Sequence, residues 1–339
     1  MAGYATPAGM VARDDLSDVA VNFVQDNPFS FGAPTVFPYL GCARRVVKHN
    51  VVDVRSTMQR QNTKRTRGAG VNRSNHKVGE QLFNIGEYSS EEPMDPNDSP
   101  YEDMSQEEPM IVRRQVATIM RDMEGDFITA LANTTTFPLS GDTGLSVGTP
   151  WSTIATADVV GNIQTGMISL QKLFGVKANA LVINEQQYSW ISRNAALRAS
   201  LGSGASPAGT QGLIPFDVLA SLLHPAIKRI IVLGSAVNTA NLGLAASMSF
   251  QWPNANAMLC RIDEGDDLSM PQIGRSLGWD VSPELPGATG SSSVNVAGAD
   301  IKLLEYAEPK TSSKLIRATA FRSLVTTAYP CGFLFGNVG

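Results

Sequence analysis

The charge of this 339-residue chain reverses its sign within one contiguous segment. Residues 44–77 carry ten lysines and arginines against a single acid, whereas residues 80–108 carry ten acids and no lysine or arginine. Blocks of like charge usually stay solvated or serve as contact surfaces, so neither half suits a buried core. The segment is therefore either two solvated loop faces or a long hairpin whose halves pair with each other or with neighbouring copies.

Apolar residues on both sides of a polar turn region favour the hairpin. Residues 46–54 are rich in valine, residues 82–85 are mostly apolar, and residues 60–74 between them are rich in glycine, asparagine and serine. Such a pattern predicts two strands joined by a long turn region. The side chains that we expect to contact another copy are Arg60, Lys64, Arg65, Arg67, Glu87, Glu91 and Glu92.

Residues 105–133 form the clearest helix in the sequence. Apolar residues recur at three- and four-residue spacing from Val112 to Leu131, which predicts one buried stripe. Ser105 and Glu108 form a capping-box pattern, and acids crowd the first turn, where the helix dipole favours them. A second helix is predicted for residues 158–174, because Gly175 is a suitable terminator.

A strand, a polar residue, an aromatic-bearing helix and a glycine-rich loop follow one another in residues 177–204. The apolar run from Ala180 to Ile183 predicts a buried strand. Asn184 is suited to capping the helix that carries Tyr188 and Trp190. We interpret both aromatic residues as packing anchors rather than as parts of an active site.

The two ends of the chain differ in pattern. Residues 1–40 contain glycine, proline and isolated aromatics without a sustained hydrophobic period, so we expect an arm that is disordered or ordered only against another surface. Residues 301–309 and 314–335 are typical of long strands that close the chain.

Common catalytic, metal and nucleotide motifs do not occur in the sequence. The three histidines and three cysteines lack metal-ligand spacing, and the segment at 202–209 has Pro207 where a dinucleotide-binding fingerprint needs glycine. The net charge of −4 indicates no global basic field for nucleic acid, and no apolar stretch is long enough for a membrane span. We therefore predict no catalytic, cofactor-binding or metal-binding residue, and no enzymatic activity.

In this order of elements the sequence resembles the major capsid proteins of tailed bacteriophages, which have the HK97-type α+β fold. The resemblance covers nearly the whole chain and is carried by the charged hairpin, by EEPMIVRRQVATIMRDMEGDFITALAN, by KANALVINEQQYSWISRNAALRASL and by SSKLIRATAFRSLVTTAYPCGFLFGNV. It implies five parts along the chain. They are an N-terminal arm at 1–40, an extended E-loop hairpin at 41–103, a peripheral domain with a long spine helix at 104–157, an axial α/β domain at 158–265, and closing strands of the peripheral domain at 266–339.

The resemblance also implies a function and a set of partners. The expected function is a structural subunit that self-assembles into pentamers and hexamers of an icosahedral head shell around double-stranded DNA. Expected partners are a separate scaffolding protein, a portal and packaged DNA bound without sequence specificity, with a decoration protein left open and no membrane. Assembly would take place in the host cytoplasm and the product would be the virion. Two alternatives remain from the residues alone, namely a nucleic-acid-binding protein that uses residues 44–77 and a small-molecule α/β enzyme.

Overall fold

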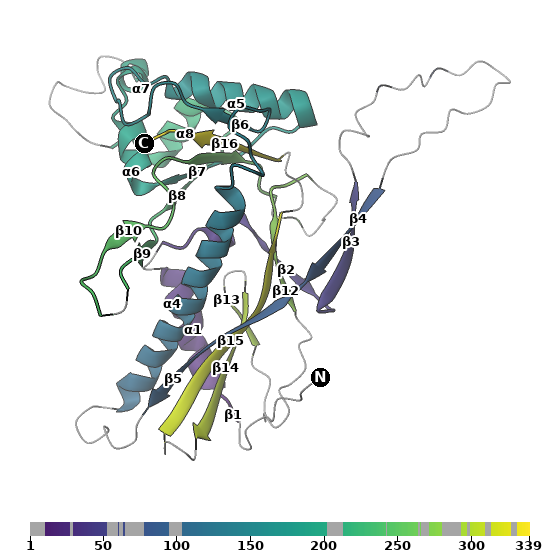
Figure 1. Ribbon diagram of the computed structural model, residues 1–339, viewed down its shortest axis with the longest axis vertical. Coiled ribbons are helices and arrows are strands. Elements are labelled where there is room, and N and C mark those ends of the chain that lie inside the picture. The colour runs from purple at the N-terminus through teal and green to yellow at the C-terminus, as the bar shows by residue number, and fades with distance from the viewer. Residues whose placement is uncertain are drawn as a thin grey trace.

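The computed structural model describes residues 11–27, 30–52, 60, 64, 78–94, 104–201, 213–241, 243–263, 265, 271–279, 293–296, 299–308, 313–326 and 331–339. These residues form two large sheets and two two-stranded ribbons, and the long helix α4 (Met104–Leu131) runs from one large sheet to the other (Figure 1). Most of the shorter helices gather at one end of the molecule, over the smaller sheet. The fold is therefore α+β, as the sequence predicts.

The larger sheet is organised around one long strand. This strand, β15, pairs antiparallel with three others, β14, β5 and β12, and the last of these also pairs in parallel with β2. The seven strands are β1 (Val11–Ala12), β14 (Ala299–Glu308), β15 (Ser313–Val325), β12 (Arg275–Trp279) and β2 (Tyr39–Cys42) in spatial order, with β13 (Ser293–Val296) beside β14 and β5 (Gly86–Met94) beside β15.

The smaller sheet is buried on both faces. Leu181 and Ile183 of β7 face a core formed with the surrounding helices, whereas Ala180 and Val182 join the core that contains α4. Burial on both faces explains why β7 reads as a continuous apolar run instead of an alternating one. The strands in spatial order are β6 (Gly144–Ser146), β16 (Gly332–Gly336), β11 (Ala257–Cys260), β7 (Ala180–Asn184) and β8 (Arg229–Leu233), and the helices are α5 (Val159–Phe174), α6 (Glu185–Ser192), α7 (Ala195–Ser200) and α8 (Phe216–Leu223).

The last strand of the chain lies in the smaller sheet, which corrects the expectation that residues 266–339 close one peripheral sheet. β16 pairs with β11 on one side and β6 on the other. Its side chains explain this position, because Phe333 and Phe335 pack into the helical core while Leu334 packs into the core of α4. A strand that is apolar on both faces needs an interior place in a covered sheet.

Helix α4 confirms the predicted apolar stripe. Val112, Val116, Met123, Phe127 and Leu131 are all fully buried, and the 28 residues span about 42 Å. The helix begins one residue before the predicted range. Glu108 does not act as the predicted cap partner, since its carboxylate binds Arg13 and Lys314.

The described part of the N-terminal arm is ordered against another surface, which is the second of the two expected alternatives, but the helices in it were not predicted. Residues 14–26 form helix α1 (Asp14–Asp26), which packs against α4, and residues 33–36 form the short helix α2 (Ala33–Val36). Phe31, Val36 and Phe37 are buried, and the ring of Phe37 meets that of Phe127 edge-on at a centroid distance of 5.4 Å. The arm therefore contributes to the core of its own chain, while residues 1–10 lie outside the described part.

Candidate intersubunit surfaces

A two-stranded ribbon leaves the body of the molecule and matches the predicted hairpin. Its strands are β3 (Val46–Val52) and β4 (Val78–Asn84), paired antiparallel from Val46 opposite Asn84 to Val52 opposite Val78. Figure 1 shows the ribbon projecting to one side of the larger sheet. The strand prediction is confirmed, and most of the tip between the strands lies outside the described residues.

The root of the β3–β4 ribbon is anchored in the body. Phe83 and Ile85 are buried in a small core with Leu277, Phe321 and Val325. The backbone closes the root as well, because the N–H of Ile85 donates to the carbonyl of Arg45 at 2.9 Å and the Arg45 Nε donates to the carbonyl of Ile85 at 3.1 Å. The ribbon is therefore held firmly where it starts.

The ribbon carries apolar side chains, at its root and beyond it, that no described part of the chain covers. Val46 is 51% exposed and Leu82 is 68% exposed. Lys48 and Glu80 form an ion pair at 2.7 Å, but both side chains are more than half exposed, and such a pair contributes only about 0–1 kcal/mol. An uncovered apolar ribbon with little support of its own is typical of a surface that another chain covers.

The predicted basic contact residues are only partly described. Arg60 and Lys64 are exposed, whereas Arg65 and Arg67 lie outside the described residues. Their role toward a neighbouring copy stays a prediction.

The predicted acidic contact residues lie in a different place from the one expected. Glu87, Glu91 and Glu92 belong to β5 of the larger sheet, not to the projecting ribbon. Residues 86–93 of β5 alternate between partly buried and exposed, a pattern that suits a strand with one covered face. Only the first residues of the acidic half, 80–84, therefore pair with the basic half in the ribbon, and Glu87, Glu91 and Glu92 do not.

Two of these acids already have partners within the chain. Glu91 accepts hydrogen bonds from the hydroxyl of Tyr306 at 2.8 Å and from Arg317 at 2.7 Å, and these groups lower the pKa of Glu91. Glu92 pairs with Arg114 at 2.6 Å and accepts a hydrogen bond from Gln115 at 3.0 Å. Glu87 is exposed and its side chain has no ion pair or hydrogen bond among the described residues.

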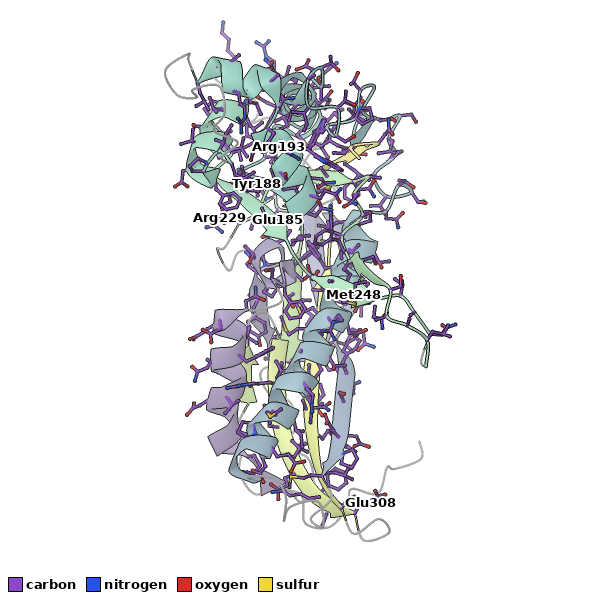
Figure 2. The ribbon with its side chains drawn as sticks, turned by 90° about the vertical axis from the view of Figure 1, so that its left-hand side faces the viewer. Glu185, Tyr188, Arg193, Arg229, Met248 and Glu308 are labelled. Carbon is purple, nitrogen blue, oxygen red and sulfur yellow. The ribbon has the colours of Figure 1, made fainter. Side chains whose placement is uncertain are left out.

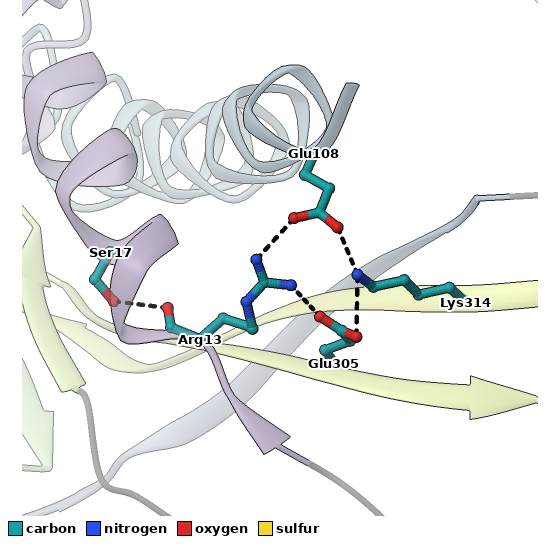
Figure 3. Close-up of polar contacts among 5 residues, drawn as sticks. All are labelled: Arg13, Ser17, Glu108, Glu305 and Lys314. Atoms are coloured by element: carbon teal, nitrogen blue, oxygen red, sulfur yellow. Dashed lines mark hydrogen bonds and ion pairs between the residues drawn. The ribbon is translucent and has the colours of Figure 1, made fainter. Parts of the chain in front are cut away.

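A cluster of four charged side chains joins three parts of the body, and sequence reasoning did not find it (Figure 3). Arg13 binds Glu108 of α4 at 2.7 Å and also binds Glu305 of β14, while Lys314 of β15 binds Glu108 at 2.5 Å and Glu305 at 3.0 Å. Burial opposes ionisation of Glu108, but hydrogen bonds from Arg13 and Lys314 outweigh it and lower the pKa of this carboxyl. The four side chains are separated by up to about 300 residues in sequence, so no local pattern reveals them.

A second projecting ribbon was not predicted as a distinct element. Strands β9 (Ala236–Asn238) and β10 (Met248–Phe250) pair antiparallel, and Figure 2 shows Met248 where this ribbon leaves the side of the molecule. Met248 is 64% exposed and Leu244 is 69% exposed. The described chain thus carries uncovered apolar residues on two separate ribbons.

Residues 177–201 have the structural role that was predicted for them, whereas the glycine-rich loop that follows lies outside the described residues. Asn184 and Gln187 form a reciprocal capping box at the start of α6, and both side chains are fully buried. The hydroxyl of Tyr188 donates to the carbonyl of Ile214 at 2.6 Å, and its ring stacks on Phe216 at 4.5 Å. Trp190 is only half-buried, so it is a weaker anchor than expected.

The described residues hold no metal-binding cluster, and burial disfavours two of their thiols as nucleophiles. Among them no set of three histidine, cysteine or acidic side chains could hold a metal ion, and no helix has both the length and the apolar character to cross a bilayer. Burial raises the pKa of the Cys331 thiol to about 12 and also raises that of Cys260, which disfavours the reactive thiolate. Cys260 and Cys331 pack into different cores on opposite faces of the smaller sheet.

Comparison with known proteins identifies the fold. No family model matches the chain, and no curated protein matches it in sequence. A phage-related protein from Bordetella bronchiseptica RB50 matches in structure with a TM-score of 0.69 at 14% identity, over 98% of both chains. The capsid structure of cyanophage P-SCSP1u matches with a TM-score of 0.50 at 11% identity, over 99% of this chain and 91% of that one. The mature capsid of bacteriophage PhiM1 matches with a TM-score of 0.50 at 10% identity, over 88% and 84%.

These likenesses extend over nearly the full length of the chain in the first two cases. The chain therefore has the HK97-type fold of phage capsid proteins, as the sequence resemblance implies. At these identities the comparison defines the fold alone.

Proposed function

We propose that this protein is a structural subunit that self-assembles into the icosahedral head shell of a tailed bacteriophage, around double-stranded DNA. The observation that carries the proposal is the β3–β4 ribbon, which is anchored at its root but exposes Val46 at the root and Leu82 beyond it. A chain that must bury such residues against other copies gains stability by assembling. The capsid fold supports the same conclusion, and with it a non-enzymatic role and a place in the virion.

The proposed division of the chain follows the described elements. The hairpin is limited to β3, β4 and the residues between them, because β5 lies in the larger sheet. We assign β16 to the axial part with β7 and β11, and the described arm to the peripheral part with α4. Arg60, Lys64, Arg65 and Arg67 are proposed to contact a neighbouring copy, together with Glu87.

Further partners follow from the proposed shell and not from any described contact. They are pentamers and hexamers of this chain, a scaffolding protein, a portal and DNA bound without sequence specificity, with assembly in the host cytoplasm. Glu91 and Glu92 would join such contacts only by exchanging their present partners, so we give them no primary role.

Electron microscopy of the expressed full-length chain, combined with size-exclusion chromatography and light scattering, tests the proposal. Closed shells or rings of subunits are expected, and Leu82→Asp should shift the protein toward unassembled chains. A monodisperse monomer at every accessible concentration would contradict a shell subunit. A monomer that binds DNA and elutes earlier with it would instead support the nucleic-acid-binding alternative.

A further inference from the structure

Glu124 of α4 is fully buried (0% exposed). Backbone amides of another segment hold its carboxylate. Its Oε2 accepts hydrogen bonds from the N–H of Ala33 at 2.8 Å and of Gly32 at 3.1 Å, and its Oε1 accepts from Gly32 at 3.2 Å. These two amides lie at the start of α2. The carboxylate therefore ties the N-terminal segment directly to the long helix.

The groups that face Glu124 from the elements packed against it are uncharged. They are the amides of Gly32 and Ala33 and the hydroxyl of Ser235, which follows β8. Ser235 is buried and its hydroxyl has no hydrogen bond of good geometry within the described residues. On α4 itself the neighbouring acids Asp122 and Asp126 bind Arg322 of the larger sheet instead.

No ion pair to Glu124 occurs among the residues that the structure describes, so a negative charge there has only dipoles to stabilise it. Desolvation by burial raises the pKa of Glu124 from 4.5 to about 7, and the amide and hydroxyl groups offset only part of this effect. A carboxylate that reached water would return to its ordinary pKa. Ionisation therefore favours any motion that opens this contact.

We propose that Glu124 is a proton-controlled latch between residues 31–37 and α4, closed while the carboxyl is neutral and loosened when it ionises. The latch is internal to one chain and does not depend on shell formation. Its consequence is that the docking of the N-terminal segment onto α4 responds to proton concentration.

The direction and range of the response follow from the two pKa values. The closed contact has the higher pKa, so its full stability is present below about pH 4.5 and is lost progressively as the pH rises to about 7. Above about pH 7 no further change is expected. The difference between the two pKa values sets a ceiling of about 300-fold on the increase in the open population.

Hydrogen exchange of the full-length chain tests the latch at the amides that form it. Exchange of the Gly32 and Ala33 N–H groups is followed by mass spectrometry between about pH 5 and about pH 8, after correction for the intrinsic exchange rate. We expect their protection to fall at least about tenfold over this range and to level off above about pH 7. Amides of β7 in the same sample serve as the internal reference for global opening.

Two variants separate the latch from general effects of charge. In Glu124→Gln the pH dependence at Gly32 and Ala33 should disappear, because the buried group no longer ionises. Glu107→Gln makes the same chemical change in the first turns of the same helix and should leave the dependence intact. A flat wild-type profile would overturn the proposal even if Glu124→Gln fails to fold, as would a pH dependence that persists in Glu124→Gln. Both results can be obtained with assembled or unassembled protein, so they are independent of the proposed function.

Discussion

Arg322 on β15 is almost fully buried and donates a hydrogen bond to Asp122 on α4 at a distance of 2.6 Å. A second bond, to Asp126, measures 2.8 Å, and the guanidinium lies 3.9 Å from the ring centroid of Tyr88. The cation is buried while the side chains of Asp122 and Asp126 are 57% and 47% exposed. Helix α4 is thus joined to the larger sheet by two ion pairs in which the cation is buried and the two carboxylates are largely exposed.

Because only the cation is buried, removing the two carboxylates should lower the free energy of unfolding more than removing the arginine does. The double variant Asp122→Ala/Asp126→Ala leaves a buried cation without a carboxylate and should destabilise the chain by about 3–5 kcal/mol. Arg322→Met leaves two solvated carboxylates and fills most of the space, so its cost should be about 1–2 kcal/mol. Urea denaturation of unassembled protein measures both values. Equal costs, or a larger cost for Arg322→Met, would contradict the account.

Adjacent residues of β4 should separate folding from assembly. Leu82 is 68% exposed, so Leu82→Ala should change the free energy of unfolding by no more than about 0.5 kcal/mol and yet reduce the yield of shells. Phe83 is buried at the ribbon root, so Phe83→Ala should cost about 3–5 kcal/mol. Denaturation and particle counts by electron microscopy are compared for both variants. If Leu82→Ala assembles normally, the ribbon is not the contact surface that we propose.

Two tryptophans, Trp151 and Trp190, differ in their expected contributions to the stability of the part that contains the smaller sheet. Trp151 is fully buried against Phe335, with a ring centroid distance of 5.6 Å, and Trp151→Ala should cost about 3–5 kcal/mol. Trp190 is half-buried, and Trp190→Ala should cost about 1–2 kcal/mol. Thermal melting of both variants ranks them. A larger effect at Trp190 would mean that its exposed side is covered in the folded protein.

The four-charge cluster predicts a loss of stability in acid. The pKa of Glu108 is lower in the folded chain than its ordinary value of 4.5, so the ionised form stabilises the fold. This contribution is complete above about pH 4.5 and is lost as the pH falls below that value. Glu108→Gln should therefore destabilise by about 1 kcal/mol at neutral pH, and the difference from wild type should vanish in acid. Melting curves of both proteins at neutral pH and in acid provide the measurement. A difference in stability between Glu108→Gln and wild type that persists in acid would argue for lost packing instead.

Local sequence patterns were sufficient to predict the elements whose buried residues are close together in the sequence. The stripe on α4, the run in β7 and the cap at Asn184 each depend on residues a few positions apart, so a single sequence reveals them. The β3–β4 ribbon was predicted for a similar reason, because its turn region interrupts two apolar runs.

What the sequence did not reveal depends on pairings between distant segments. Three contacts join residues that lie far apart in the chain. They are the ion pairs of Arg13, the ion pairs of Arg322 with α4, and the hydrogen bonds from Gly32 to Glu124. Helix α1 was missed although Leu16, Val19, Ala20, Phe23 and Val24 follow helical spacing, because residues 1–40 were interpreted as one irregular segment. The helix packs on α4, a contact between distant segments that the sequence does not show. The charge reversal was misleading for β5, because the sequence shows the sign of Glu91 but not that Arg317 lies opposite it.

The position of β16 has a consequence for synthesis on the ribosome. This strand contains residues 332–336 of a 339-residue chain, yet it lies between β6 and β11 in the interior of its sheet. At a translation rate of roughly 5–20 residues per second, β11 emerges several seconds before the strand that must pair with its open edge. The nascent chain therefore cannot finish this sheet until β16 has emerged. Any chain that lacks β16 leaves β6 without a partner in this sheet and leaves one edge of β11 open.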